Sequence, residues 1–243
     1  MHTCHCEAVV LGTMDYREAD KIVTLFTLER GKLKGVARGA KKSVKRFGGA
    51  LELFARLNLE LTLKEGLAQV CSADIVTVFP RIRKELLKIA LASYVCELTD
   101  AMLPEEMCSP RLFRLLTAYL EHLDCSPATP SDRRFFELNF LNILGYRPML
   151  EHCVVCTMEL SGVARSSSST AASGLMCGKC GRGERPVTIA TVILLRRALL
   201  TGRFGVINFP PAELEEAEDF IDWAIAAHIQ RPLKTLSFLR ETG

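Results

Sequence analysis

Two pairs of cysteines in the second half of the chain have the spacing of metal ligands. The segments "EHCVVCTM" and "LMCGKCGR" each contain a Cys-x-x-Cys motif, and 20 residues separate the two motifs. Each motif can present two thiolates from a tight turn, and two such turns complete a tetrahedral shell for Zn²⁺. Four protein ligands leave no position for water, so the spacing predicts one structural zinc ion rather than a catalytic one. The predicted ligands are Cys153, Cys156, Cys177 and Cys180, with redox pairs or buried thiols of chance spacing as the alternative.

The rest of the chain contains no recognisable catalytic motif. It lacks the phosphate-binding pattern GxxxxGK[ST], the nucleophile pattern GxSxG and the zinc-protease pattern HExxH. The N-terminal segment "HTCHC" offers more metal ligands, but such closely spaced side chains rarely close a tetrahedral site, and chain termini are usually mobile. We therefore predict that the protein is not an enzyme.

A run of basic residues marks a second candidate site. Between Arg30 and Arg46 there are eight lysines and arginines and no acid, although the whole chain has a formal net charge of only +3. A local positive field of this kind suits a surface for a polyanion, and the glycines in "GVARGAKKSVKRFGG" let a phosphate chain approach closely. A solvated loop without a ligand is the alternative. The candidate nucleic-acid contacts are Lys32, Lys34, Arg38, Lys41, Lys42, Lys45 and Arg46, and the nearest aromatic rings are Tyr16, Phe26 and Phe47.

The elements around the basic run are predicted to be strands. In "ARLNLELTLKEG" every second residue is a leucine, which indicates a strand with one wet face. Two strands in "DKIVTLFTLERGKLKGVARG" are joined by a short connection that contains glycine, and "EAVVLGT" and "LAQVCSADIVTVF" supply two more. Five short strands without a long helix favour a small barrel, where loops commonly bind single strands.

After Pro80 the pattern becomes helical. The segments "RIRKELLKIALASYVCELTDAML", "SPRLFRLLTAYLEHL" and "TPSDRRFFELNFLNILG" have helical spacing, with Ser109 as an N-cap and Gly145 as a stop. Three further helices are predicted in "TIATVILLRRALLTG", "PAELEEAEDFIDWAIAAHI" and "RPLKTLSFLRET". The predicted fold class is a multidomain α+β protein: a barrel at 1–80, a helical domain at 81–149 and 187–243, and a Cys₄ zinc module inserted at 150–186. A serine-rich stretch lies within this module.

The sequence also indicates the compartment. The N-terminus has no charged start followed by an apolar core, so it does not resemble a signal peptide. The apolar stretch "VTIATVILL" is too short to span a bilayer. We therefore expect a cytoplasmic protein whose ten cysteines are reduced and which is not bound to a membrane.

With these residues in view, the chain resembles the RecO family of bacterial recombination mediators. The resemblance rests on "EAVVLGTMDYREADKIVTLFTLERGKLKGVARGAKKSVKRFGGALELF", "RKELLKIALASYVCELTDAMLPE" and "RRFFELNFLNILGYRPMLEHCVVC". It implies an N-terminal OB-fold and a helical domain with a zinc module. It also implies binding of single- and double-stranded DNA at the nucleoid, annealing of complementary strands, and action with RecR to load RecA on strands coated by single-strand-binding protein.

A partner site follows from the resemblance. The acidic, apolar-ended C-terminal tail of single-strand-binding protein needs an apolar groove edged by cations. Helices that carry Arg111, Arg114, Arg133 and Arg134 could provide such a groove. Alternatively, these arginines are solvated or pair with Glu137 and Asp132.

Two other functions remain open at this stage. One is a zinc-ribbon RNA-binding protein of translation or RNA processing, which competition between DNA and RNA would distinguish. The other is a zinc-stabilised scaffold whose basic loop is incidental, and such a protein would show no salt-dependent binding of nucleic acid.

Overall fold

The computed structural model describes residues 2–64, 66–160, 164–166, 174–181, 185–229 and 231–242. The serine-rich stretch at 167–173 lies outside the described residues. The chain divides into two compact units, one of Met1–Pro127 with Gln230–Gly243 and one of Ala128–Ile229. The domain boundaries predicted near residues 80, 149 and 186 stay predictions.

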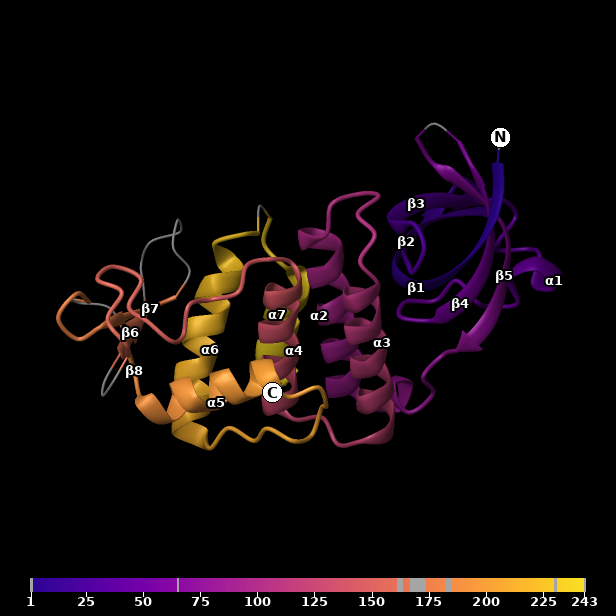
Figure 1. Cartoon of the computed structure of the whole chain (residues 1–243). Coiled ribbons are helices and arrows are strands. Elements are labelled where there is room, and N and C mark those ends of the chain that lie inside the picture. The colour runs from indigo at the N-terminus through magenta and orange to yellow at the C-terminus, as the bar shows by residue number, and fades with distance from the viewer. Residues whose placement is uncertain are drawn as a thin grey trace. The chain divides into compact units, whose positions relative to one another are not determined.

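The N-terminal part of the first unit is a closed five-stranded barrel of the OB-like type (Figure 1), as predicted. Its strand order is β1-β2-β3-β5-β4, and neighbours are antiparallel except for the parallel pair β3 and β5. The strands are β1 (His2–Tyr16), β2 (Asp20–Thr27), β3 (Gly31–Ala37), β4 (Arg56–Leu63) and β5 (Ala68–Thr77).

Alternating leucines fill the barrel. Leu57, Leu59 and Leu61 are buried in the core of the barrel, whereas Asn58 between them is exposed, as the period of two predicted. The connection from β3 to β4 contributes to the same core, because Phe47 from the short helix α1 (Val44–Phe47) is buried there. This connection is therefore anchored to the barrel at its middle.

Each connection between consecutive strands lies at one of the two ends of the barrel. The β1–β2 turn and the β3–β4 connection, which holds the basic run, lie at one end. The β2–β3 turn and the β4–β5 turn lie at the opposite end. The strands between them set the separation of any two sites at these ends.

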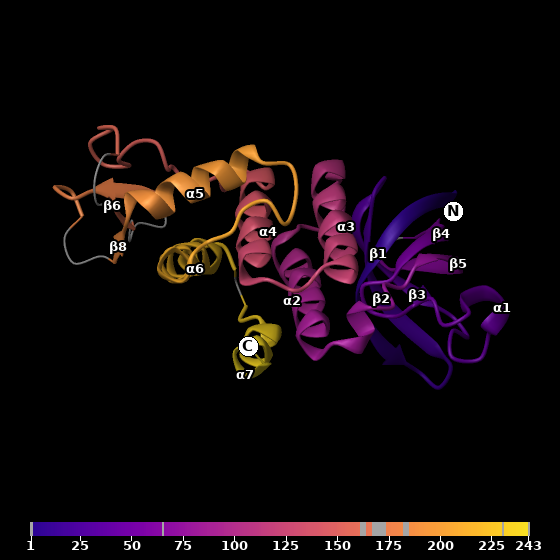
Figure 2. The ribbon, with the colours of Figure 1, turned by 90° about the horizontal axis from the view of Figure 1, so that it is seen from below.

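Three helices complete the first unit (Figure 2): α2 (Leu86–Met102), α3 (Pro110–Cys125) and α7 (Lys234–Thr242). Helix α3 begins as predicted, with the Ser109 hydroxyl accepting from the Leu112 N–H and Pro110 in the first turn. A short 3₁₀ turn (Ile82–Lys84) precedes α2. The α2–α3 segment packs tightly on the barrel, because a Cβ at Gly31 would lie 2.2 Å from the Met107 carbonyl oxygen.

The second unit consists of α4 (Pro130–Ile143), α5 (Ile189–Leu200), α6 (Pro211–Ala226) and a small sheet. The sheet has the order β7-β6-β8, formed by Leu175–Cys177, Ala164–Ser166 and Pro186–Val187. Glu216 of α6 accepts hydrogen bonds from the Thr188 N–H and hydroxyl, and it thereby holds the start of α5. Across the described residues, no helix is long and apolar enough to span a bilayer.

Candidate metal centre and nucleic-acid interface

Two turns present the four cysteines of the predicted metal site. In the first, the Cys153 carbonyl accepts from the Thr157 N–H at 2.9 Å. In the second, the Cys177 carbonyl accepts from the N–H groups of Cys180 and Gly181 at 3.1 and 3.0 Å. The Val154 N–H donates to the Leu175 carbonyl at 3.0 Å, which ties the first turn to strand β7 and so to the second turn.

The sulfur atoms are brought together as the spacing predicted. The Sγ atoms of Cys153, Cys156, Cys177 and Cys180 all lie within 4.8 Å of one another, and those of Cys156 and Cys177 are 3.7 Å apart. A tetrahedron with metal–sulfur bonds of about 2.3 Å has edges of about 3.8 Å. The cluster could therefore hold a metal ion without a change of backbone, and four thiolates are the ligands that structural zinc sites use.

The thiols of this cluster influence one another's ionisation. Burial raises the pKa of Cys153, but N–H groups of Cys156, Cys177 and Val155 directed at its sulfur outweigh burial and lower the pKa to about 6. The Cys180 and Lys179 N–H groups lower the pKa of Cys177. Hydrogen bonding to Cys156 and Cys177 raises the pKa of Cys180 to about 12. Full ionisation of the four sulfurs therefore requires a cation that balances their charge.

The basic run forms an ordered loop at one end of the barrel. Gly39 has a φ of +69°, a backbone conformation that favours glycine. Its N–H donates to Asp20 Oδ1 at 2.8 Å. The Lys41 N–H donates to the Ala19 carbonyl at 3.0 Å, so the β1–β2 turn supports the loop from one side. Phe47, only 2% exposed, anchors the other side.

Five of the predicted cationic residues gather in this loop, which we call the basic loop (Arg38–Arg46). Arg38, Lys42, Lys45 and Arg46 are exposed residues, and the Arg46 guanidinium donates to the Arg38 carbonyl at 2.8 Å. The Lys41 ammonium lies 2.9 Å from the Asp15 carboxylate. The lysine hydrogen bond outweighs other effects and lowers the pKa of the Asp15 carboxyl. The loop thus concentrates positive charge, and Asp15 of β1 pairs with one of its five cations.

The two lysines that precede the loop differ from each other. Lys34 is exposed on β3, and its ammonium lies 3.5 Å from the Glu105 carboxylate. Lys32 is buried, and its Nζ donates to the Asp100 carbonyl oxygen at 2.6 Å. Lys32 is therefore not an accessible member of the predicted contact set, because its ammonium faces helix α2.

Among the three aromatic rings considered for base stacking, only Tyr16 is accessible. Phe26 is buried and packs edge to face on Phe113 at 5.6 Å, and Phe47 is buried in the barrel core. Tyr16 is 37% exposed at the end of β1, with the Arg17 guanidinium 5.1 Å from its ring centre. Tyr16 pairs with Asp20 beside the β1–β2 turn, whose Ala19 carbonyl holds the basic loop, so this accessible ring lies at the same end of the barrel as the loop.

The four arginines of the predicted partner groove lie in different environments. Arg111 and Arg114 are exposed on α3 of the first unit. Arg134 on α4 of the second unit is 1% exposed and pairs with Glu137, Asp222 and Glu218 at 2.6–2.9 Å. Arg133 pairs with Glu137 at 2.9 Å. Arg133 and Arg134 thus belong to an internal ion-pair network, one of the two alternatives that the sequence left open.

The protein thus combines an OB-like barrel with a helical region and with a cysteine cluster that could hold a metal ion. The family models described as Recombination protein O N terminal and C terminal match residues 1–79 and 83–237. The chain belongs to the RecO family of DNA repair proteins, and its role is that of a recombination mediator.

Similar curated proteins cover the whole chain. A protein of Geobacter sulfurreducens named DNA repair protein RecO is 56% identical over 241 residues, which is 99% of each chain. The proteins of the same name from Geobacter metallireducens and Pelobacter propionicus are 54% and 45% identical over 242 residues, with 99% of this chain and 98% of each relative covered. These names describe DNA repair proteins and no enzyme class.

Proposed function

We propose that the protein binds single- and double-stranded DNA through the basic loop and anneals complementary strands during recombinational repair at the nucleoid. The observation that supports this proposal most directly is the anchored loop, which holds five cations on one surface at the end of an OB-like barrel. Binding of this kind gains its free energy from release of counterions and depends little on base sequence.

Annealing requires charge and exposure rather than an active site. Two strands repel each other, and cations that neutralise their phosphates lower this repulsion while the base edges remain free to pair. Tyr16, at the same end of the barrel as the loop, offers one ring on which a base can stack without reading its identity. The protein in this account performs no bond chemistry.

The cysteine cluster has a structural role in this proposal. One Zn²⁺ on Cys153, Cys156, Cys177 and Cys180 would join the two turns, close to the segment that α5 holds through the Arg196 guanidinium, which donates to the Leu150 carbonyl at 2.5 Å. Because all four positions are protein sulfurs, the ion would supply folding free energy and no reactive water.

The proposed partners are RecR and single-strand-binding protein, with RecA loaded as the outcome. For the acidic tail of single-strand-binding protein, Arg111 and Arg114 are the accessible candidates among the four predicted arginines. An Arg111→Glu, Arg114→Glu variant should lose binding of a tail peptide, whereas unchanged binding would remove these residues from the tail site. Arg133 and Arg134 are unsuitable for this test, because their replacement would disrupt the internal network.

The experiment that tests the function is an annealing assay with complementary oligonucleotides coated by single-strand-binding protein. The protein should accelerate annealing, and the Lys41→Ala, Lys42→Ala, Lys45→Ala, Arg46→Ala variant should lose most of that acceleration. Competition with RNA of the same sequence separates a DNA-binding mediator from an RNA-binding protein. Equal acceleration by both forms of the protein, or preferential binding of RNA, would contradict the proposal.

A further inference from the structure

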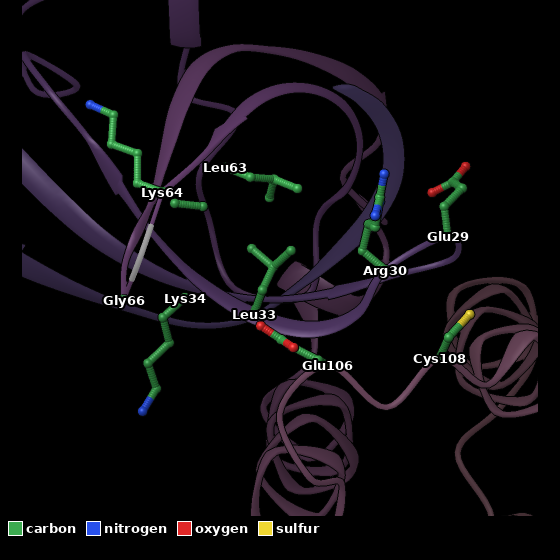
Figure 3. A pocket seen from close by; sticks show the side chains of 10 residues that line it. Glu29, Arg30, Leu33, Lys34, Leu63, Lys64, Gly66, Glu106 and Cys108 are labelled. Atoms are coloured by element: carbon green, nitrogen blue, oxygen red, sulfur yellow. The ribbon is translucent and has the colours of Figure 1, made fainter. Parts of the chain in front are cut away.

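A cavity lies at the end of the barrel opposite the basic loop. Its volume is about 440 Å³, within the usual range for small-ligand sites. The β2–β3 turn, strand β3, the β4–β5 turn and the segment between α2 and α3 form its walls (Figure 3). The lining residues that carry the argument are Arg30, Leu33, Lys34, Leu63, Lys64 and Glu106.

The middle of the cavity is apolar, and two carboxylates line it, of which that of Glu29 already accepts from the Glu7 N–H at 3.1 Å. Figure 3 shows Leu33 and Leu63 facing each other across the cavity, with the carboxylate of Glu106 next to Leu33. Glu106 has a φ of +61°, and its N–H donates to the Lys32 carbonyl at 2.8 Å. The barrel thus holds Glu106 in a backbone conformation that is costly for a residue other than glycine.

The rim of the cavity carries three cations and the Glu29 carboxylate. Arg30, Lys34 and Lys64 are exposed, and the ammonium groups of Lys34 and Lys64 point outward from the rim in Figure 3. The Lys64 Nζ donates to the Gln69 side-chain oxygen at 2.8 Å. Because this amide oxygen is uncharged, the contact does not neutralise the Lys64 ammonium. The Lys34 pair with Glu105 is exposed on both sides, so it contributes little free energy and can give way to a phosphate.

The cavity is connected to the basic loop by one strand. Lys34 lies on β3, and the basic loop begins directly after the end of that strand at Ala37. Lys64 follows β4, and the next strand begins at Ala68, which pairs with Gly35 beside Lys34, so Lys64 and Lys34 lie near each other. The stretch from Lys34 to Arg38 spans roughly 13 Å, a length within the reach of a strand that occupies the roughly 4 to 16 nucleotides typical of an OB-fold.

We propose that this cavity binds one nucleotide of a single DNA strand whose backbone continues along β3 from the basic loop. Phosphates near the cavity contact Lys34, Lys64 and Arg30, and the base lies between Leu33 and Leu63. The Glu106 carboxylate accepts a hydrogen bond from an exocyclic amino group, which cytosine carries and thymine lacks. The proposal rests on the proposed DNA-binding function and adds a base preference, which backbone contacts alone do not provide.

The test compares oligo-dC and oligo-dT of equal length by fluorescence anisotropy at several salt concentrations. Wild-type protein should bind oligo-dC roughly three- to tenfold more tightly than oligo-dT, as one hydrogen bond to a base implies. Glu106→Gly should remove this preference and keep the salt slope, and glycine also relieves the left-handed backbone. Lys64→Ala should flatten the slope by about 0.7, the contribution of one phosphate on a single strand.

The matched control is Lys84→Ala, an exposed lysine outside the cavity that should leave both the slope and the preference unchanged. Equal affinity of the wild type for oligo-dC and oligo-dT, or an unchanged preference in Glu106→Gly, would overturn the proposal. So would binding of a poly-glutamate peptide that requires Lys64, since the cavity would then be a peptide site. These outcomes are separate from failure of the basic loop, which is measured by loop variants that retain the cavity.

Discussion

The buried ammonium of Lys32 joins the barrel to helix α2 through Asp100. Its Nζ donates to the Asp100 carbonyl at 2.6 Å and lies 3.4 Å from the Asp100 carboxylate. The same carboxylate pairs with Arg231, before helix α7, at 2.6 Å. One acidic residue of α2 therefore connects a barrel strand and the C-terminal helix of the first unit.

This relationship predicts that Lys32 acts in stability rather than in DNA binding. Lys32→Met should lower the free energy of unfolding by about 1–3 kcal/mol, because a buried, charge-assisted hydrogen bond is lost. The salt slope of DNA binding should stay unchanged. Lys34→Met on the same strand is the matched control, and it should flatten the slope while leaving stability unchanged, because Lys34 is exposed. A flattened slope with unchanged stability in Lys32→Met would show instead that Lys32 contacts DNA.

The Asp15–Lys41 pair predicts that the chain moderates its own affinity for DNA. Asp15→Asn should free the Lys41 ammonium for a phosphate and raise affinity roughly two- to fivefold, the scale of an exposed ion pair. Glu18→Gln changes the net charge equally without releasing Lys41, so it should have the smaller effect. Equal gains in both variants would mean that only net charge matters.

The same pair has a defined pH dependence. Since Lys41 lowers the pKa of the Asp15 carboxyl, the pair is fully formed above the ordinary pKa of aspartate and is lost as the pH falls through the lowered value. The affinity gain of Asp15→Asn should therefore be constant between roughly pH 6 and 8, far above the ordinary aspartate pKa. A gain that varies strongly across this window would assign the effect to another group.

The cysteine cluster predicts about one zinc per chain by metal analysis, as a single closed site implies. Cys177→Ser should lose the metal and lower the melting temperature, because metal binding supplies folding free energy. Affinity for zinc should fall as the pH falls, because protons compete for the thiolates, and it should fall more steeply below about 6, where the Cys153 thiolate also takes up a proton.

The matched control for the metal site is Cys125→Ser, which removes an exposed free cysteine outside the cluster. This variant should keep its zinc and its melting temperature. If Cys177→Ser kept both as well, the cluster would be a group of reduced thiols without a structural ion.

Local patterns in the sequence were sufficient for much of the fold. The alternation of Leu57, Leu59 and Leu61 predicted a strand with one buried face, and Ser109 before Pro110 predicted the start of α3; the structure confirms both. The spacing of the two Cys-x-x-Cys motifs predicted the cluster because each ligand pair is set by a local turn. These features depend on neighbours a few residues apart.

Features that depend on distant partners were not accessible in this way. Lys32 belongs to the basic run by sequence, but its environment is decided by Asp100, 68 residues later. Arg134 has an ordinary place on α4, and the cost of burying its charge is offset by pairing with Glu218 and Asp222 on α6. Charge patterning alone therefore does not distinguish an accessible cation from one engaged inside the fold.

The most direct measurement of the central claim is a salt titration of single-stranded oligonucleotide binding. Each phosphate contact contributes about 0.7 to the slope of log affinity against log salt. The Lys41→Ala, Lys42→Ala, Lys45→Ala, Arg46→Ala variant should therefore flatten the slope by up to about 3 units, similarly for unrelated sequences. A charge-matched variant with alanine at Lys84, Lys179, Arg197 and Arg203 should keep the wild-type slope. An unchanged slope in the basic-loop variant, or equal losses in both variants, would contradict the assignment of DNA binding to the basic loop.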